Sequence, residues 1–194
     1  MTVRPLLLAS TSPQRRAILD QLGIPFDAVV PEYTEHDPPE ADAERLVREH
    51  ARGKARSAAA QAVGRPVLGV DTTVVLDGRI YAKPADEADA EQMLAGLAGK
   101  THAVLSGLCL LTAEWEVVEA AATLVSFRAL SPRDVSAYVA SGEWEGRAGA
   151  YAIQGRGASL VERVEGDYLN VVGLPVALLV RLLAERFPGA YGFW

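Results

Sequence analysis

Short apolar runs alternate along the chain with segments whose apolar residues recur at helical spacing, and this pattern predicts an α/β fold. The runs that predict strands are Arg4–Ala9, Phe26–Val30 and Pro66–Leu76. Two longer runs rich in β-branched residues lie within Thr101–Phe127, on either side of Ala113-Glu114, and predict an antiparallel hairpin. Gly149–Val164 is punctuated by glycine and is compatible with a strand or a loop.

Helices are predicted between these runs. Ser12-Pro13 marks one helix start, because a serine hydroxyl caps free amides and proline fits the first turn, and Gly23 ends that helix. A long helix is predicted from Ala43 to about Val63, with an apolar stripe that includes Val47, Ala51, Ala55 and Ala58. The other predicted helices are Ala85–Leu97, Ser131–Gly142 and Leu174–Phe187. The sequence therefore predicts a single domain over residues 1–194, with a curved mixed sheet flanked by helices and two lobes around a central cleft.

Composition narrows the function. The 194 residues carry a formal net charge of −6, so no overall basic field favours nucleic acid or an anionic membrane. Cys109 is the single cysteine, which excludes an internal disulfide and favours a reducing compartment. The apolar stretch near the first residue is too short for a signal peptide or a membrane span, so we expect a cytoplasmic protein.

Asp71 lies inside the apolar run Pro66–Leu76, where an ionised carboxylate is costly unless it is paired or ligated. Asp77-Gly78 predicts a two-residue hairpin turn, which would place Thr72 opposite Lys83 and Asp71 on the other face. Asp71 and Lys83 can share a site only if the strand is distorted or the pairing ends before Lys83. A structural ion pair, a metal ligand and a general base all remain open for Asp71.

Other clusters allow both an ordinary and a functional interpretation. Ser10–Arg16 at a strand-to-helix junction suits either a capped helix or a phosphate site. Lys54 follows the apolar stripe of its helix, so it is either a solvated lysine with a buried stem or a cation aimed into a cleft. The acidic loop with Glu32, Glu35 and Asp37 is either solvated or a source of oxygen ligands for Mg²⁺ or Mn²⁺. Gln154 in a glycine-rich block offers both a donor and an acceptor to a base edge.

Taken in order, the motifs of this chain resemble the Maf proteins, which are nucleoside triphosphate pyrophosphatases. The matching pieces are L-A-S-T-S-P-Q-R-R-A-I-L, K-A-R at Lys54, G-V-D-T at Asp71, A-K-P at Lys83, S-F-R at Arg128, A-G-A-Y-A-I-Q-G-R-G up to Gly157, and G-D-Y-L-N-V-V-G-L-P up to Pro175. The resemblance extends from Leu6 to about Phe187. It implies a Maf/inosine triphosphatase-like fold, often as a dimer, that cleaves nucleoside triphosphates between the α- and β-phosphates with a divalent cation.

The resemblance also implies roles for individual residues. Asp71 matches the proton acceptor, and Ser10, Arg15, Glu35, Lys54 and Lys83 match positions that line the phosphate and metal site. Thr72 and Gln154 match specificity positions of the subgroup that acts on dTTP and UTP. Gln14 departs from the family pattern S-P-R-R and brings no charge, and Arg16 cannot replace the missing arginine because one helical residue is a turn of about 100°.

Three functions are therefore compared. The first is hydrolysis of dTTP, UTP or modified pyrimidine triphosphates to the monophosphate and pyrophosphate, with Asp71, Lys54 and Lys83 as catalytic residues, and Glu35 and Asp71 as ligands of Mg²⁺ or Mn²⁺. The second is a nucleotide-binding regulator of septum formation and cell division without turnover. The third is a pyrophosphatase for unusual purine triphosphates such as ITP. The expected partner is the nucleotide, with no nucleic acid and no membrane, and a homodimer is compatible with the family.

Overall fold

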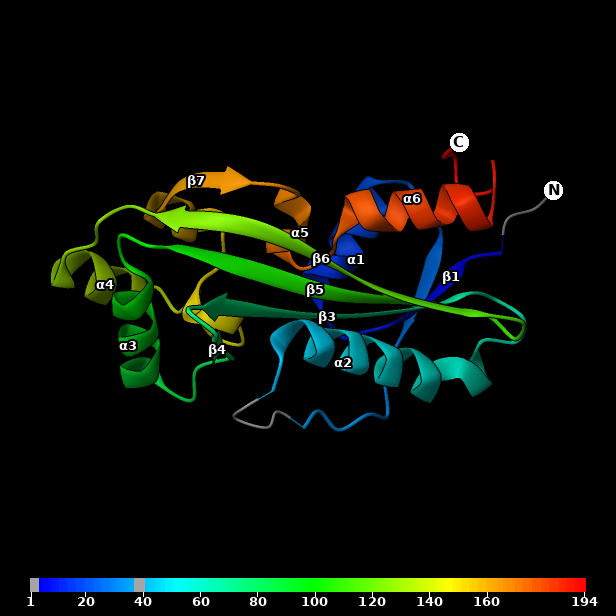
Figure 1. The fold of residues 1–194 in the computed structure, drawn as a ribbon, viewed down its shortest axis with the longest axis horizontal. Helices are drawn as coiled ribbons and strands as arrows, with labels where there is room; N and C mark the ends of the chain where they lie inside the picture. Colours follow the sequence, from blue (N-terminus) through cyan, green and yellow to red (C-terminus); the bar gives the residue numbers. More distant parts are fainter. Residues whose placement is uncertain (1–3, 37–40) are drawn as a thin grey trace. The chain divides into compact units, whose positions relative to one another are not determined.

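The protein is built on a mixed β-sheet with helices packed against it (Figure 1). The computed structural model describes residues 4–36 and 41–194, so Asp37 of the acidic loop lies outside the described residues. The strands are β1 Leu6–Ala9, β2 Phe26–Val29, β3 Val67–Leu76, β4 Arg79–Tyr81, β5 Thr101–Leu111, β6 Glu116–Phe127 and β7 Val161–Glu165. The α-helices are α1 Pro13–Gln21, α2 Ala43–Ala58, α3 Glu87–Leu97, α4 Pro132–Val139, α5 Tyr168–Val172 and α6 Val176–Arg186.

Within the described residues these strands form a seven-stranded sheet in the order β2-β1-β3-β5-β6-β7, and β4 pairs with β3. β1 is parallel to both of its neighbours, with Ala9 opposite Val29 and Gly69, whereas β3–β4 and β6–β7 are antiparallel. The predicted mixed α/β sheet is therefore confirmed. The short connection from β5 to β6 is closed by the Thr112 amide, which donates to the Trp115 carbonyl at 2.9 Å, so the predicted hairpin is also present.

The chain divides into two compact units, which are described separately. Unit 1 comprises the described part of Met1–Asp71 together with Ser106–Ala121 and Gly173–Trp194. Unit 2 comprises Thr72–Leu105 and Ala122–Val172, so β3, β5 and β6 each contribute residues to both units. A single domain over residues 1–194 and a cleft between two lobes stay predictions.

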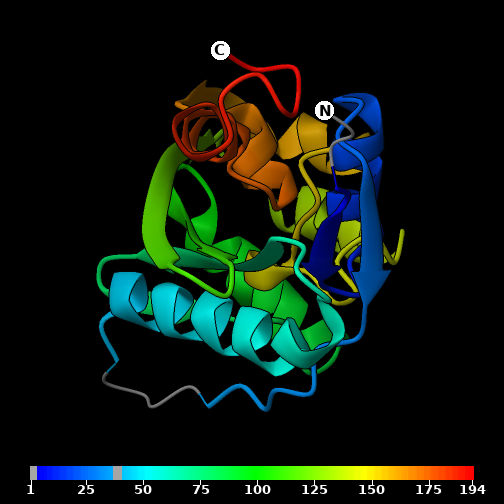
Figure 2. The same ribbon diagram turned by 90° about the vertical axis from the view of Figure 1, so that its right-hand side faces the viewer.

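In unit 1, α2 and α6 lie on opposite faces of the strands (Figures 1 and 2). Small residues let α2 approach the sheet closely. A Cβ atom at Gly69 would lie 2.1 Å from the Ala51 carbonyl oxygen, and one at Gly107 would lie 2.0 Å from the Val47 carbonyl oxygen. Any side chain at these two glycines would push the helix away. The backbone of α2 is thereby fixed against β3, the strand that carries Asp71.

Unit 2 has its own hydrophobic core, in which residues of α3 and α4 pack with the unit 2 parts of β5 and β6. Its aromatic centre includes Phe127 and Tyr151, whose ring centroids are 4.8 Å apart. The buried His102 ring meets both of them edge to face. These contacts make the core of unit 2 rich in rings, whereas the α2 side of unit 1 is built mainly from alanine and valine.

The structure departs from the sequence prediction most clearly at one helix end and in one short helix. The helix expected to reach Val63 ends at Ala58, and a 3₁₀ turn at Ala59–Gln61 follows. Val63 and Gly64 then adopt positive φ angles of 47° and 74°, which a right-handed helix does not allow. The short helix α5 was not predicted, because its few residues carry too little periodicity to be read from sequence.

Candidate functional site

The carboxyl end of β1 is where the candidate residues of unit 1 gather. In a parallel sheet with strand order 2-1-3, the connections diverge next to β1, and ligands bind in the crevice beyond the carboxyl ends of such strands. Ser10 directly follows β1, and Asp71 lies two residues beyond Gly69, the last β3 residue in register with β1. The topology alone therefore brings Ser10 and Asp71 to the same edge of the sheet.

Lys54 joins two carboxylates at this edge. Its Nζ atom is 2.6 Å from Asp71 Oδ1 and 2.5 Å from Glu35 Oε1. The side chains of Lys54 and Asp71 are only 10% and 13% exposed, whereas that of Glu35 is 39% exposed. The buried charge that was anomalous in the sequence is thus paired, and the pair opens toward solvent on the Glu35 side.

The position of Lys54 follows from its helix. Asp42 caps α2, because its side chain accepts from the Arg45 amide, and the alanine stripe faces the sheet. Lys54 shares the buried side with Ala51 and Ala55, so its stem is packed and its ammonium reaches β3. The interpretation of Lys54 as a solvated lysine is therefore wrong: the side chain points inward.

A second pair of site residues lies at the start of α1. Arg15 donates from Nη1 to Ser10 Oγ at 3.1 Å and from Nε to the Gly173 carbonyl at 2.8 Å. Burial lowers the pKa of Arg15 below the usual arginine range, and the carboxylates of Asp71 and Glu35 oppose this shift. The electrostatic coupling places Arg15 in the same field as the Lys54 cluster. Two cations and two carboxylates thus share one site in unit 1.

The first turn of α1 is ordered by its own side chains. The Ser12 hydroxyl accepts from the Arg15 amide at 3.4 Å and donates to Gln14 Oε1 at 3.2 Å, while the Ser12 amide donates to Ser10 Oγ at 3.2 Å. Ser12 therefore caps the helix as predicted, and Gln14 is held over the first turn. Arg16 is exposed. The ordinary interpretation of this segment as a capped helix and its interpretation as a phosphate site are compatible.

Lys83, Thr72 and Gln154 belong to unit 2, and their placement relative to Lys54 stays a prediction. Lys83 and Gln154 are exposed. The β3–β4 pairing has the expected register at Leu76 and Arg79 but ends with Val74 opposite Tyr81, so Lys83 lies beyond it. The end of the pairing before Lys83 is one of the two conditions under which Lys83 and Asp71 could share a site.

The glycine-rich block owes part of its composition to packing. A Cβ at Gly149, which has φ +70°, would lie 2.9 Å from a Val74 methyl carbon. A Cβ at Gly157 would lie 1.8 Å from the Ala152 carbonyl oxygen. These glycines are required by close contacts within unit 2 whatever Gln154 binds.

The described residues include no group of three or more histidine, cysteine or acidic side chains suited to a metal ion. Glu35 and Asp71 nevertheless converge on one atom, Lys54 Nζ. Mg²⁺ is usually held by one or two carboxylates and completed by water and substrate phosphates, so two carboxylates suffice for that mode of binding. The donor set therefore fits an ion that arrives with a phosphate ligand.

Sequence reasoning missed how the Glu35 loop is held. The Tyr33 hydroxyl is 2.9 Å from Nδ1 of the buried His50, and the Tyr33 ring covers Gly53 of α2. It also missed the Gly173 carbonyl as an acceptor for Arg15. Gly53, in the middle of a helix, was a sequence signal for its contact with Tyr33. The sequence did not identify Tyr33 as the partner, because it lies 20 residues earlier in the chain.

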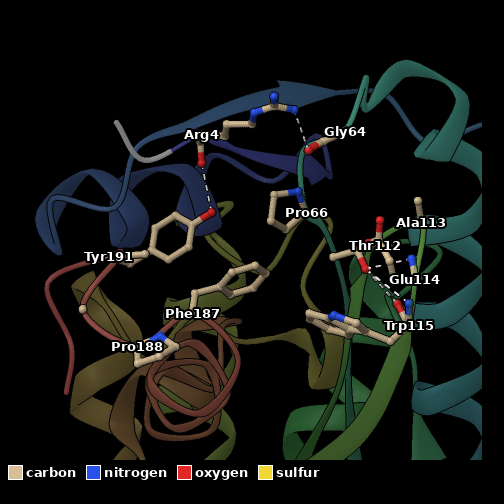
Figure 3. A pocket seen from close by; sticks show the side chains of 12 residues that line it. Arg4, Gly64, Pro66, Thr112, Ala113, Glu114, Trp115, Phe187, Pro188 and Tyr191 are labelled. Carbon is tan, nitrogen blue, oxygen red and sulfur yellow. Dashed lines mark hydrogen bonds between the residues drawn. The ribbon is translucent and has the colours of Figure 1, made fainter. Parts of the chain in front are cut away.

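Apart from the Lys54 cluster, unit 1 contains a pocket of about 520 Å³. Trp115, Phe187 and Tyr191 line it, and the Tyr191 hydroxyl donates to the Arg4 carbonyl (Figure 3). None of the residues that line this pocket belongs to the Lys54 cluster. Aromatic, proline and small residues therefore form most of the pocket wall, and Arg4 and Glu114 are the charged residues that line it.

The fold and the site define an α/β protein with a mixed-charge cluster at the carboxyl end of parallel strands, an arrangement suited to a phosphate ligand. The chain belongs to the Maf family, since the model of that family, described as Maf-like protein, matches residues 5–186. The resemblance found in the sequence motifs is therefore confirmed.

Similar proteins carry one shared description. A Gloeobacter violaceus protein named dTTP/UTP pyrophosphatase is 48% identical over 95% of this chain and 97% of its own length. Relatives of the same name from Deinococcus radiodurans and Escherichia coli O157:H7 are 45% and 43% identical, over 98% and 93% of this chain and 97% and 92% of their own lengths. The solved structure of the Staphylococcus aureus Ham1 protein matches with a TM-score of 0.46 and 14% identity, over 64% of this chain and 72% of that chain. Among the described helices, none has the length and apolar character needed to span a membrane.

Proposed function

We propose that this protein hydrolyses nucleoside triphosphates, with dTTP and UTP as the preferred substrates, to the nucleoside monophosphate and pyrophosphate. The observation that carries the proposal is the sharing of the buried Lys54 ammonium by Asp71 and Glu35 at the carboxyl end of β1. The relatives named dTTP/UTP pyrophosphatase support the substrate class, because they match nearly the whole chain.

Phosphate binding is assigned to the cations of unit 1. An ammonium has three N–H donors, and the carboxylates use two of those on Lys54, so the third suits a phosphate oxygen. The Arg15 guanidinium and the Ser10 hydroxyl supply further donors. In this proposal Gln14 adds a neutral hydrogen bond where the family usually has an arginine.

Proton transfer is assigned to Asp71. A water molecule attacks the α-phosphorus, the bond between that phosphorus and the bridging oxygen breaks, and pyrophosphate leaves with the bond electrons. Asp71 orients the water and accepts its proton. The buried site around Lys54 stabilises the charge that develops on the phosphate oxygens, because its donors are fixed before the reaction begins.

Glu35 and Asp71 would hold Mg²⁺ or Mn²⁺. Such an ion offsets phosphate charge and acts as a Lewis acid toward the phosphoryl oxygens. The argument for it is one of charge, since Arg15 and Lys54 are balanced by Asp71 and Glu35 and leave no net positive charge for a triphosphate.

Three residues of unit 2 complete the proposal. Lys83 would stabilise the leaving pyrophosphate, and Thr72 and Gln154 would read the pyrimidine base. We also propose that the protein acts in the cytoplasm, binds neither nucleic acid nor membranes, and forms a homodimer. The single, buried cysteine and the net charge of −6 are consistent with these assignments.

The test is a pyrophosphate-release assay with dTTP, UTP, 7-methyl-GTP and ITP side by side, each with Mg²⁺ and with Mn²⁺. We expect release to be fastest with dTTP and UTP and to require the divalent ion. Fastest release from ITP would instead support the purine activity. Tight nucleotide binding without release from any substrate would support the regulatory function and contradict hydrolysis.

A further inference from the structure

Consecutive contacts tie the Glu35 loop to one side of α2. His50, Gly53 and Lys54 occupy positions i, i+3 and i+4 of the helix and therefore lie on the same face. His50 bonds the Tyr33 hydroxyl, Gly53 accommodates the Tyr33 ring, and Lys54 pairs with Glu35. This face of α2 is devoted to a segment of three residues, Tyr33–Glu35.

Gly53 is required by the Tyr33 ring. A Cβ atom at position 53 would lie 2.2 Å from Tyr33 Cε2 and 2.5 Å from Cζ, both far inside van der Waals contact. Glycine is less favourable than alanine inside a helix. Alanine occupies the nearby buried positions 51, 55 and 58 of α2, so position 53 forgoes helix stability to let the ring touch the helix backbone.

The hydrogen bond with His50 fixes the far end of the same ring. His50 is 3% exposed, and its Nδ1 atom is 2.9 Å from the Tyr33 hydroxyl. The two rings also meet edge to face, with centroids 5.7 Å apart. Tyr33 is therefore held at its face by Gly53 and at its tip by His50, and Glu35 follows only two residues later along an otherwise irregular loop.

We propose that Tyr33, seated on Gly53 and bonded to His50, is a positioning residue that sets the Glu35 carboxylate against Lys54. The inference rests on the proposed function, because it assigns a role to Glu35 in that site. The ion pair of Glu35 with Lys54 is by itself a weak restraint on this loop, because the Glu35 side chain is partly exposed.

The central test is Gly53→Ala, which displaces the ring without touching Glu35, Lys54 or Asp71. We expect the melting temperature to change little, because the gain in helix propensity offsets the loss of the hydrogen bond between Tyr33 and His50. Turnover of dTTP should nevertheless fall by about tenfold, since small misplacements of site groups are costly. Gly96→Ala is the matched control. Gly96 is also a helical glycine beneath a tyrosine, with a Cβ position 3.0 Å from Tyr81 Oη, but it lies in unit 2, and the three atoms nearest to that position all belong to Tyr81.

A double-mutant cycle separates positioning from general damage. If Gly53→Ala acts only through the ring, it should have no further effect on turnover once Tyr33→Ala has removed that ring. A second readout needs no substrate. The Mn²⁺ concentration that half-saturates the protein, followed by electron paramagnetic resonance, should rise in Gly53→Ala and in Tyr33→Ala but not in Gly96→Ala.

The outcomes separate this inference from the proposed function. If the wild type binds Mn²⁺ but releases no pyrophosphate, hydrolysis fails as a function and the Mn²⁺ titration of the variants decides the positioning role. Equal Mn²⁺ affinity in the wild type and in Gly53→Ala, no Mn²⁺ binding at all, or additive effects in the cycle would each overturn the inference.

Discussion

Two buried titratable side chains, one in each unit, are accommodated in opposite ways. Lys54 in unit 1 is 8% exposed and contacts two carboxylates. His102 in unit 2 is 1% exposed, and its Nε2 atom is 2.8 Å from the Tyr151 hydroxyl. Its Nδ1 atom has no hydrogen-bond partner among the described residues. Burial lowers the pKa of His102 to about 4, so this ring is neutral near pH 7.

This difference indicates that Lys54 belongs to a functional site, whereas His102 belongs to the hydrophobic core of unit 2. Burying a charge is costly, and the simplest remedy is to lose the charge, as His102 does among aromatic rings. Lys54 is instead provided with opposite charges, an arrangement that often contributes little net stability to the fold. The charged cluster around Lys54 lies at the carboxyl end of parallel strands and adds little stability to the fold. Binding of a ligand explains such a cluster better than stability does.

The sharpest way to break this comparison is to neutralise Asp71. Asp71→Asn keeps the shape of the side chain but removes the proton acceptor, so we expect turnover to fall by roughly 10³-fold. Circular dichroism and the melting temperature should change little, because Lys54 keeps Glu35 as a partner. Retained turnover would mean that Asp71 is a structural partner of Lys54 and not the acceptor.

Removing the ammonium should cost both activity and stability. Lys54→Met leaves Asp71 and Glu35 facing each other, and we expect turnover to fall by about 10²-fold. Denaturant titration should show a loss of about 2 kcal/mol. This is less than the penalty for a fully buried pair, because Glu35 is 39% exposed. If the variant were more stable and its turnover were unchanged, Lys54 would be a core residue like His102 and not part of a functional site.

The pH dependence of stability should come from unit 2. An unfolded histidine binds a proton near pH 6.5, whereas folded His102 does so only near pH 4. Between these values the unfolded state holds the extra proton, so stability falls as the pH drops from about 6.5 to 4, by at most about 3 kcal/mol. His102→Gln cannot titrate and should flatten this part of the stability curve measured by urea titration. An unchanged slope would assign the effect to other groups.

The smallest expected effect concerns the buried Cys109 thiol, which has no role in the proposed site. Burial raises the pKa of Cys109 to about 12, so the thiolate is scarce at neutral pH. The native protein should react slowly with a thiol reagent such as dithionitrobenzoate at pH 8, and the urea-unfolded protein should react at once. Rapid reaction of the native protein would show that the α2 side of the sheet opens readily.

Local sequence patterns were sufficient to predict the placement of residues that depends only on their own helix or strand. Lys54 was expected on the buried side of its helix, and Asp71 stood out because of the apolar strand around it. Both expectations are confirmed by the burial of these side chains. The cap at Ser12 was also predictable, since helix starts depend on neighbouring residues.

Features that depend on distant partners were not predictable in this way. Tyr33 meets α2 across a long loop, and Arg15 finds the Gly173 carbonyl 158 residues away. The helix expected to reach Val63 ends early because the chain reverses at Val63-Gly64 on its way to β3. Such contacts are set by tertiary packing, which single-sequence periodicity does not encode.

The interleaved composition of unit 1 has a consequence for biosynthesis. A ribosome completes residues 72–105 and 122–172, which build unit 2, before it supplies Gly173–Trp194 to unit 1. The Gly173 carbonyl that holds Arg15 belongs to this late segment. A nascent chain can therefore form the ring-rich core of unit 2 while the guanidinium of Arg15 still lacks that acceptor, so the pairing of Lys54 with its carboxylates can precede the final orientation of Arg15.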